Sequence, residues 1–415
     1  MKTETKKSYG RRKMFDIKLN IDFFIHLFCF ISVLLIGADI FSINVGVHFR
    51  IDQILLVILY VLIKVKGGYH IKKNNWLFAF ALFSLISMLF GTNFKRGLMY
   101  YCYIVYNIIF VFYNFSGYVK LYGLSQFIKI FRKTCYVQVV IFFLQYFLAI
   151  FLNYEISFLP NYGYVLGIPR FKLWFYEPSY FATYISFWLT LSFYMWLVVE
   201  KRSYLIDFLL CIFMLILCTA TTGFIAIALC IIIIYFIWLF KRITLKKLLF
   251  PVFCGFAILI LYLLFSDIFD FFVGRLFSSS LDAASGGRIT LWLETWNVFK
   301  NNPLFGVGPG NYGLYLGKDA GYVPSNVTLE LMSTLGIFSA IAFYGFSLQL
   351  IIKSVRLYRR NQNDETKLLV ACALGLIVFT CVLQINQSYL RLYHWMFFGM
   401  IYGGLNLNLS KINKT

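Results

Sequence analysis

The residues best suited to chemistry in this sequence lie in a polar, glycine-rich segment between two hydrophobic runs. The segment begins at Gly286 and ends at Asn311. Its only arginine, Arg288, is followed at intervals of four residues by Trp292 and Trp296. Spanning a membrane does not require such residues, since a membrane-spanning helix needs only about 20 mostly apolar residues in succession. We therefore expect this segment to lie outside the bilayer and to carry the function.

A carboxylate that could act as a general base lies in a second polar segment. Glu177 directly precedes Pro178, and proline is favoured at the first position of a helix. A carboxylate there stabilises the helix N-terminus electrostatically, which would be a purely structural role. At the mouth of a cavity, partial desolvation would instead raise its pKa toward the range of a general base. The sequence favours neither role over the other.

The glycine-rich segment predicts a short helix. Ser285 can cap a helix that begins near Gly287, and Asn302 would end it, because a residue before a proline (here Pro303) avoids the helical conformation. The spacing of four residues places Arg288 and the two tryptophans on one face of this helix. The same pattern is typical of an amphipathic helix that lies on the membrane surface with tryptophans at the headgroup level.

The glycines after this helix predict a tight turn. Gly306, Gly308 and Gly310 alternate with other residues, and glycine allows a backbone that neighbouring groups approach closely. A phosphate-binding GxGxxG loop needs a preceding strand and an opening helix. This segment has neither, so we do not expect it to bind a nucleotide.

The composition indicates an all-α polytopic membrane protein. Hydrophobic residues make up 61% of the 415 residues and charged residues 13%, whereas about a quarter of the residues in a soluble domain are charged. About 12 apolar runs are long enough to be transmembrane helices. We expect them near 21–40, 51–66, 76–92, 98–116, 134–153, 178–199, 204–221, 223–240, 248–266, 327–352, 368–387 and 392–409.

The basic residues predict the orientation of these helices. If the N-terminus is cytoplasmic, 28 of the 38 Lys and Arg residues fall on the cytoplasmic side, as the positive-inside rule requires. Both termini would then be cytoplasmic. Two outer loops remain, at about 154–177 and 267–326, and the longer one carries the short amphipathic helix. A nucleic-acid-binding protein would instead carry one basic patch with stacking aromatic residues on a soluble face.

The remaining patterns point to a single integral membrane domain over residues 1–415. We find no internal repeat of the transporter type. The nine cysteines lie in or at the ends of the apolar runs and form neither a disulfide framework nor a metal-binding pattern. We also read the first apolar run as a retained helix, because no small-residue cleavage site follows it.

These motifs resemble the superfamily of O-antigen polymerases and O-antigen ligases of bacterial envelopes. Its members have about a dozen spans and a large outer loop near the C-terminal third. That loop contains an arginine, a tryptophan, Asn-Pro-Leu-x-Gly-x-Gly-x-Gly and then His-Asn-x-x-Leu-Glu before a span with Leu-Gly-Ile. The corresponding residues here are Arg288, Trp292, Pro303, Leu304, Gly306, Gly308, Gly310, Asn326, Leu329, Glu330, Leu335, Gly336 and Ile337. The resemblance is close over 286–337, and the ligase-like core would cover about 170–400.

One departure from the family pattern bears on the reaction. Ligases usually have a histidine directly before the asparagine, where this chain has Ser325 before Asn326. The Glu-Pro-Ser sequence at Glu177 also looks more like that of polymerases. Both features favour a polymerase of polyprenyl-diphosphate-linked repeat units in the bacterial cytoplasmic membrane. A ligase that transfers glycan to lipid A-core is the alternative.

The resemblance also suggests roles for individual residues. Negative charge develops on the leaving diphosphate when the sugar–diphosphate bond breaks, and cationic side chains or a metal can stabilise it. The predicted outer loops contain no Asp-x-Asp and no His/carboxylate cluster, so we expect neither a metal nor another cofactor. We expect Arg288 to bind the diphosphate, Glu177 to act as the base, and six further residues to bind substrate: Arg170, Arg391, Trp292, Gly308, Gly310 and Asn326.

Several residues near these candidates have simpler interpretations. Arg391, at the outer end of the last span, is more typical of an interfacial anchor. His394 lies beside a tryptophan and is more typical of a packed histidine. Glu294 falls off the face of Arg288, and Glu330 falls in the opening turn of a span, where the helix dipole explains a carboxylate.

The expected partners follow from the same resemblance. They are a polyprenyl-diphosphate-linked glycan donor and acceptor, membrane lipid, a flippase and a chain-length regulator. A lipid-glycan flippase is the alternative from another class of protein. Transporters of this kind carry ionisable groups at mid-membrane, whereas here Asp207 and Glu200 fall near the ends of apolar runs.

Overall fold

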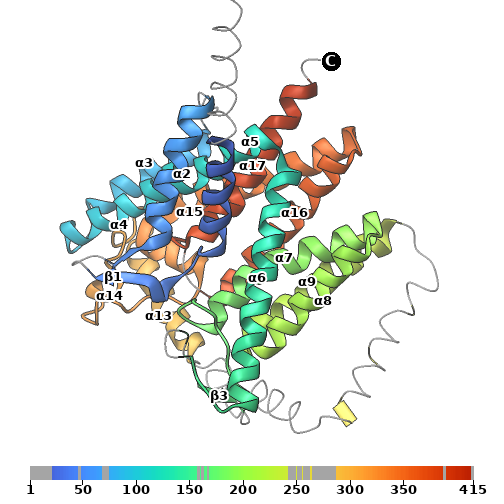
Figure 1. Ribbon diagram of the computed structural model, residues 1–415. Coiled ribbons are helices and arrows are strands. Elements are labelled where there is room, and N and C mark those ends of the chain that lie inside the picture. Colours follow the sequence, from blue (N-terminus) through green and yellow to red (C-terminus); the bar gives the residue numbers. More distant parts are fainter. Residues whose placement is uncertain are drawn as a thin grey trace, which may run out of the picture.

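The computed structural model is built almost entirely of helices (Figure 1). The structure describes residues 21–44, 48–67, 74–156, 159, 163–165, 168–241, 249, 255, 262–263, 287–386 and 389–412. The all-α class predicted from composition is confirmed. The strands in the described residues form two small antiparallel hairpins, which the sequence did not predict: β1 (Ser42–Asn44) with β2 (His48–Arg50), and β3 (Tyr164–Val165) with β4 (Ile168–Pro169).

The first half of the chain provides the following elements. They are a helix Ile21–Leu34, η1 (Asp39–Phe41), α2 (Ile51–Gly67), α3 (Asn75–Met88), α4 (Phe94–Tyr106), the π-helical turn η2 (Asn107–Phe112), α5 (Tyr113–Tyr122), α6 (Leu124–Phe151), α7 (Pro178–Val199), α8 (Arg202–Leu217) and α9 (Thr221–Lys241).

The described residues of the second half provide a further set of helices. They are α13 (Arg288–Asn301), α14 (Tyr312–Tyr315), α15 (Val327–Arg360), α16 (Asp364–Val382), η3 (Leu383–Ile385) and α17 (Leu392–Ile412).

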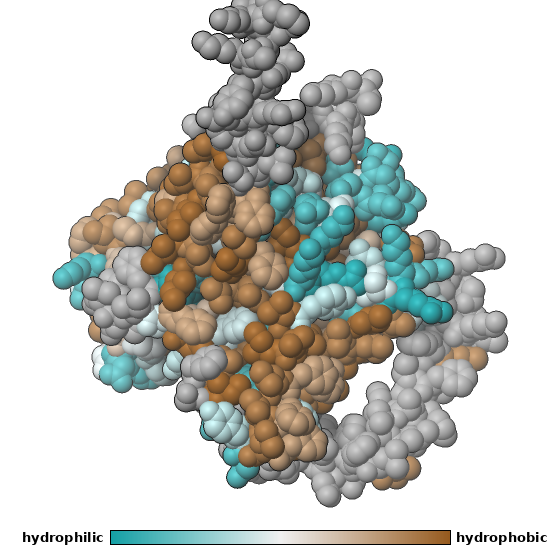
Figure 2. Space-filling model, in the orientation of Figure 1, coloured by the Kyte–Doolittle hydropathy of each residue, from teal (hydrophilic) through white to brown (hydrophobic). Residues whose placement is uncertain are grey.

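Six helices of the described residues are long and apolar enough to cross a membrane. The continuous helix Phe94–Tyr122 is one of them, and helices Ile21–Leu34 and Asn75–Met88 are apolar but shorter. Each expected apolar run overlaps a helix, except 248–266, most of which lies outside the described residues. Hydrophobic residues cover the middle of the face shown in Figure 2. The chain is a multi-pass membrane protein.

Close packing of aromatic side chains holds the centre of the bundle together. Helix α7 packs against α8, α9 and α16, while α17 packs against α5 and α15 packs against α3. The rings of Phe187 and Phe397 stack with their centroids 3.9 Å apart. On α17, glycine allows close helix approach, since a Cβ atom at Gly399 would lie 2.4 Å from the carbonyl oxygen of Phe112.

A break in α15 fixes the glycine-rich segment to the bundle. Gly336 has non-helical φ and ψ angles of 80° and 174°, which suit glycine because it lacks a Cβ atom. A Cβ at this position would lie 2.1 Å from the carbonyl oxygen of Leu304. At the same break, the N–H of Ile337 donates to the carbonyl of Pro303 at 3.0 Å. The Leu-Gly-Ile sequence therefore makes a docking point for the loop that follows α13.

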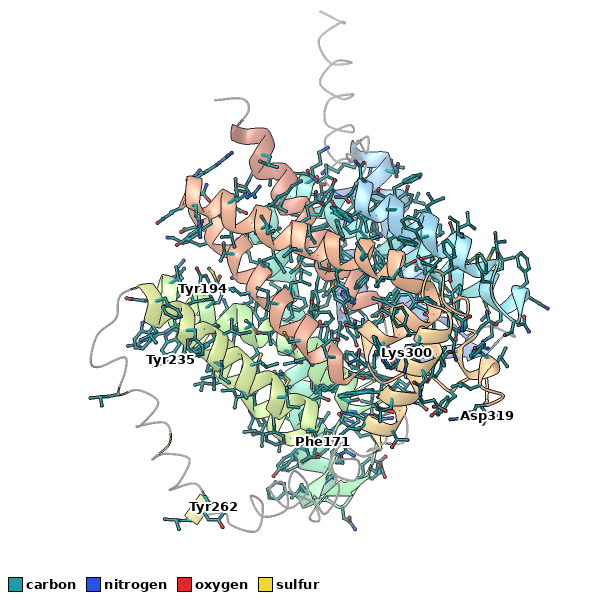
Figure 3. All side chains as sticks on the ribbon, turned by 180° about the vertical axis from the view of Figure 1, so that it is seen from behind. Phe171, Tyr194, Tyr235, Tyr262, Lys300 and Asp319 are labelled. Carbon is teal, nitrogen blue, oxygen red and sulfur yellow. The ribbon has the colours of Figure 1, made fainter. Side chains whose placement is uncertain are left out.

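The loops that carry the candidate residues gather at one end of the bundle, which we call the loop end. It consists of residues 37–44, 168–177, 287–326 and 389–391. Figure 1 shows β1, β3, α13 and α14 at the lower side of the molecule, away from the C-terminus. Figure 3 labels Phe171 in one of these segments and Lys300 and Asp319 in another.

Candidate functional site at the loop end

Glu177 forms the N-cap position of α7. Its backbone is extended (φ −136°, ψ 155°), and Pro178 follows as the first helical residue. The carboxylate makes no capping hydrogen bond to the backbone. Instead, the hydroxyl of Ser179 donates to its Oε2 at 3.0 Å. Glu177 is half-buried, so its carboxylate is positioned by a neighbouring hydroxyl and still reaches the surface.

Arg391 lies beside this helix start and is held by two interactions. Its Nη1 contacts Oδ2 of Asp39 at 2.7 Å, and its guanidinium lies over the ring of Tyr180, 3.9 Å from the centroid. Asp39 also accepts from the Nη1 of Arg50 at 2.7 Å and from the backbone N–H of Tyr176 at 3.1 Å. A planar guanidinium suits such combined ion-pair and stacking contacts.

The charges of this cluster determine the protonation of Asp39. Burial would by itself raise the pKa of this carboxyl group, but the neighbouring charges of Arg391 and Arg50 outweigh burial and lower the pKa. The same ion pair raises the pKa of Arg391 against the effect of burial. Asp39 is therefore ionised at neutral pH. The sequence analysis included Arg391 as a candidate but not Asp39, which is its partner.

The segment from 168 to 177 is positioned by this cluster and by packing. Arg170 follows β4, is half-buried, and its backbone N–H donates to the carbonyl of Gly163 at 2.8 Å. Further along, the ring of Phe175 packs against Gly37, where a Cβ atom would lie 2.5 Å from the ring. The structure thus brings Glu177 and Arg391 together, with Arg170 on the same segment as Glu177.

Helix α13 carries Arg288 in its first turn. The expected start and end are confirmed, since Gly287 and Asn302 cap the helix, but the N-cap residue is Gly287 with φ +80° and not Ser285. Ser285 itself lies outside the described residues. Glycine replaces a side-chain cap here because the backbone adopts a left-handed conformation. Arg288 is half-buried.

Trp292 connects α13 to the start of α15. Its indole N–H donates to the hydroxyl of Ser325 at 3.2 Å. Asn326 then caps α15 by accepting from the N–H of Leu329 at 2.9 Å, and its amide donates to the carbonyl of Gln384 at 2.7 Å. Asn326 therefore connects α15 with η3. This is a structural role, which Asn326 would have in addition to any role in substrate binding.

Further hydrogen bonds connect the segment that contains Gln384 with the start of α7, where Glu177 lies. Asn386, two residues further on, donates to the carbonyl of Ser179 at 3.1 Å and to the hydroxyl of Thr183 at 2.9 Å. Hydrogen bonds between successive segments thus connect α13 with the start of α7. The residues predicted from the two loops belong to one connected region of the loop end.

The glycine-rich turn is packed as tightly as its sequence predicted. Gly308 and Gly310 have φ angles of +87° and +70°. A Cβ atom at Gly308 would lie 2.6 Å from the Cα of Gly91, and one at Gly310 would lie 2.5 Å from the ring of Tyr100. Asn311, which is buried, accepts from the N–H of Asn93 at 3.0 Å. These contacts fix the turn against the start of α4.

Two other ionisable residues lie where packing accounts for them. Glu294 accepts from Lys318 at 2.6 Å and from the hydroxyl of Tyr322 at 2.8 Å. Burial by itself raises the pKa of Glu294, but the hydrogen bonds from Lys318 and Tyr322 together with the charge of Lys318 outweigh it and lower the pKa. His394 is 1% exposed and is surrounded by aromatic rings, including that of Phe343. The packing role favoured for His394 matches its place in α17.

Glu330 lies at the helix position that its sequence predicted, but it is more buried than that position suggested. It lies in the first turn of α15 and is only 6% exposed. A buried carboxylate is a stronger functional candidate than an exposed one at a helix end. The sequence does not reveal this burial, because it depends on which parts of the chain pack around the start of α15.

The described residues contain no group of three or more His, Cys, Asp or Glu side chains arranged to hold a metal ion. The polar groups of the loop end are arginines, single carboxylates, amides and hydroxyls. Such groups can bind anionic and hydroxyl-rich ligands and can transfer a proton. Fold and site together define a multi-pass membrane protein with a polar, arginine-containing region at one end of the bundle.

Comparisons with known proteins agree with this class. Residues 206–344 match the family model described as O-antigen ligase. The teichuronic acid biosynthesis protein TuaE of Bacillus subtilis (strain 168) is 26% identical over 128 residues, which cover 29% of this chain. The match spans 26% of the relative, about a quarter of its length. Over these residues the chain is similar to proteins of the superfamily of O-antigen ligases and polymerases.

The matched range covers only part of the candidate site. It contains Arg288, Trp292, Gly308, Gly310 and Asn326, whereas the residues from the shorter loop and the last helix fall outside it.

Proposed function

We propose that this protein polymerises polyprenyl-diphosphate-linked oligosaccharide repeat units at the outer face of the bacterial cytoplasmic membrane. The observation that carries this proposal is the placement of Glu177 beside Arg391 at the loop end, connected through Asn386 and Asn326 to α13. One carboxylate and several arginines in a connected region fit transfer of a sugar from a diphosphate.

The reaction would use these residues in the following way. A hydroxyl oxygen of the acceptor sugar attacks the anomeric carbon of the donor, and the bond between that carbon and the diphosphate oxygen breaks. Glu177 takes the proton of the hydroxyl, since a positioned general base contributes roughly 10²–10⁴-fold to the rate. Arg288 binds the departing diphosphate, whose electron pair and negative charge remain on the polyprenyl carrier.

The other arginines have distinct roles in this proposal. Arg170 binds a phosphate or sugar from the same segment as Glu177. Arg391 is already paired with Asp39 and stacked on Tyr180, so it acts as a positioning residue for the start of α7. Trp292 offers a flat aromatic ring to a sugar, while its N–H remains bonded to Ser325.

Ser325 supports polymerisation over ligation. At the position where ligases usually carry a histidine, this chain has a hydroxyl that already accepts a hydrogen bond from Trp292. A hydroxyl does not titrate near neutral pH and cannot replace the imidazole as a base. The relative is also named for teichuronic acid and not for O-antigen.

The surface glycan of a deletion strain tests the proposed function. A polymerase deletion removes long chains and leaves a single repeat unit attached. A ligase deletion removes all glycan from lipid A-core, and a flippase deletion causes lipid-linked repeats to accumulate inside the cell. Either of the last two results would overturn the proposal.

A further inference from the structure

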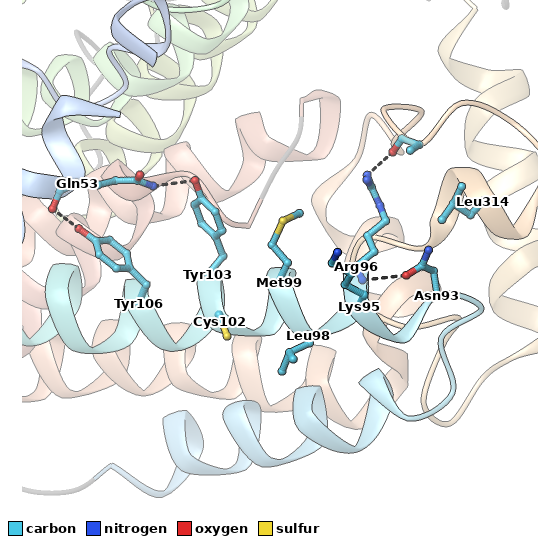
Figure 4. A pocket seen from close by; sticks show the side chains of 11 residues that line it. Gln53, Asn93, Lys95, Arg96, Leu98, Met99, Cys102, Tyr103, Tyr106 and Leu314 are labelled. Carbon is cyan, nitrogen blue, oxygen red and sulfur yellow. Dashed lines mark hydrogen bonds between the residues drawn. The ribbon is translucent and has the colours of Figure 1, made fainter. Parts of the chain in front are cut away.

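An open cavity of about 770 Å³ lies along α4, next to the glycine-rich turn (Figure 4). Its lining combines an apolar middle with charged and polar ends. The middle is formed by Leu98, Met99 and Cys102, all on α4, and Leu314 on α14 lies near the cationic end (Figure 4). Lys95 and Arg96 line one end, and Gln53 and two tyrosines line the other.

The polar groups at the tyrosine end are satisfied within the protein. The hydroxyl of Tyr103 accepts from the amide of Gln53 at 2.9 Å, and the hydroxyl of Tyr106 donates to the carbonyl of Gln53 at 2.6 Å (Figure 4). The aromatic rings can therefore face an apolar ligand without leaving a buried polar atom unpaired.

The cationic end has the opposite character. Lys95 and Arg96 lie in the first turn of α4, which contains no acidic residue. Positive side chains are unfavourable near a helix N-terminus, because the helix dipole already places partial positive charge there. Bound negative charge would relieve this repulsion. Lys95 is exposed, so its ammonium group can meet such a ligand.

Arg96 connects this end with the proposed active site. Its guanidinium donates to the carbonyl oxygens of Gly310 and Ala320 and to the hydroxyl of Tyr100. Gly310 belongs to the turn that follows α13. At the other end, Gln53 accepts from the backbone N–H of Arg50, which is paired with Asp39. The cavity is thus continuous with the segments that hold the candidate site.

We propose that this cavity binds the lipid-linked acceptor by its carrier, with the isoprenoid chain over Leu98, Met99 and Cys102 and the acceptor's diphosphate at Lys95, while Arg288 binds the diphosphate of the donor. A long, flexible apolar chain that ends in several negative charges complements an apolar groove with two cations at one end. The identity of this lipid rests on the proposed function. Its position in the fold rests only on the cavity and its charges.

Binding to the purified full-length protein in detergent tests the position. Native mass spectrometry would measure the affinity for undecaprenyl diphosphate and for phosphatidylglycerol. Lys95→Ala should weaken undecaprenyl diphosphate binding about tenfold, as expected for loss of one charged contact. Met99→Trp, which fills the groove, should weaken it at least as much. Lys300→Ala, a change of another exposed lysine on α13, should leave it unchanged.

A thiol-protection measurement requires no variant and covers the case in which Met99→Trp fails to fold. Among the described cysteines, Cys102 and Cys381 are exposed, and Cys102 lines the cavity. Undecaprenyl diphosphate should slow modification of Cys102 by a small methanethiosulfonate reagent several-fold and leave Cys381 unaffected. Equal modification of Cys102 with and without the lipid would overturn the proposal.

The outcomes separate this inference from the proposed function. Equal protection and affinity with phosphatidylglycerol would show a general lipid groove and overturn the assignment of the occupant. Wild-type affinity of both variants would overturn the position, while polymerisation by the same protein would stand. Conversely, selective binding in the groove by a protein that makes no polymer would overturn the function and leave the groove in place.

Discussion

The guanidinium of Arg391 and the ring of Tyr180 are stacked with 3.9 Å between the guanidinium carbon and the ring centroid. Tyr180 is three residues after Glu177, on the first turn of α7. Asp39, which is 352 residues away from Arg391 in the sequence, accepts from the same guanidinium. Segments from the first, middle and last parts of the chain therefore lie together beside the proposed base. Arg391 contacts both of the other segments and holds them together.

Asp39→Asn should destabilise the protein, because it removes the negative charge that the half-buried Arg391 and Arg50 share, and of the two only Arg50 has a second carboxylate partner, Asp52. Removing one partner of a buried ion pair typically costs about 3–5 kcal/mol, and we expect a fall of several degrees in the unfolding temperature in detergent. Asp364→Asn is the matched control, since the side chain of Asp364 is 85% exposed.

The difference in stability between wild type and Asp39→Asn should depend on pH, because the pKa of Asp39 is lowered. A carboxylate with a lowered pKa stabilises the fold above its ordinary value of 3.8, and this stabilisation is lost as the pH falls through the lowered pKa. The gap between wild type and Asp39→Asn should be constant from about pH 5 to 8 and shrink below about pH 4. A gap that already closes at pH 6 would contradict the assigned ion pair.

Gly308→Ala should disturb the glycine-rich turn by two effects. A left-handed backbone costs a residue with a Cβ atom about 1–2 kcal/mol, and the new methyl group would also lie 2.6 Å from the Cα of Gly91. Gly317→Ala separates the two effects, because Gly317 has φ +66° but no atom within 4 Å of the added carbon. We expect Gly308→Ala to lower the unfolding temperature clearly more than Gly317→Ala. Equal effects would show that close packing of the turn is unimportant.

The sequence was sufficient to predict the helix of the polar segment and the turn after it. Gly287 and Asn302-Pro303 are local signals, and they do mark the ends of α13. The alternating glycines correctly predicted a closely approached turn, because only a residue without Cβ fits there. The membrane class followed from composition alone.

The contacts between distant segments could not be predicted in the same way. Nothing in the sequence around Asp39 indicates Arg391 as its partner, since the pair depends on how the helix Ile21–Leu34 and α17 pack. The burial of Glu330 is hidden for the same reason, because it depends on the packing of distant segments around the start of α15. One signal in the sequence could have indicated Asp39. Its charge lies at the end of an apolar run, where a charged side chain is energetically unfavourable unless it has a partner of opposite charge.

Glu177→Gln should reduce turnover by roughly 10²–10⁴-fold, as expected for loss of a general base. Donor affinity should change little, because the arginines remain. Glu155→Gln controls for the lost charge, because Glu155 is an exposed carboxylate that precedes the β3–β4 hairpin. Glu330→Gln tests the buried alternative. Near-normal turnover of Glu177→Gln with a large loss for Glu330→Gln would move the base to Glu330.

Catalysis should not depend on a divalent metal ion. The arginines of the loop end can balance the charge of the leaving diphosphate. The purified protein should therefore keep its activity in excess chelator. Loss of activity that magnesium or manganese restores would reveal a metal site that we have not identified.

Polymerisation in a purified system tests the central claim most directly. Full-length protein in nanodiscs would receive a synthetic polyprenyl-diphosphate-linked repeat unit, and products would be separated by length. Wild type should produce a ladder of chains that differ by one repeat. Arg288→Ala should reduce the rate about 10²–10³-fold, as for loss of one well-placed donor, and Arg288→Lys should recover little because lysine lacks the planar fork. A full-length ladder from well-folded Arg288→Ala, or no ladder from wild type with an authentic repeat unit, would contradict the account.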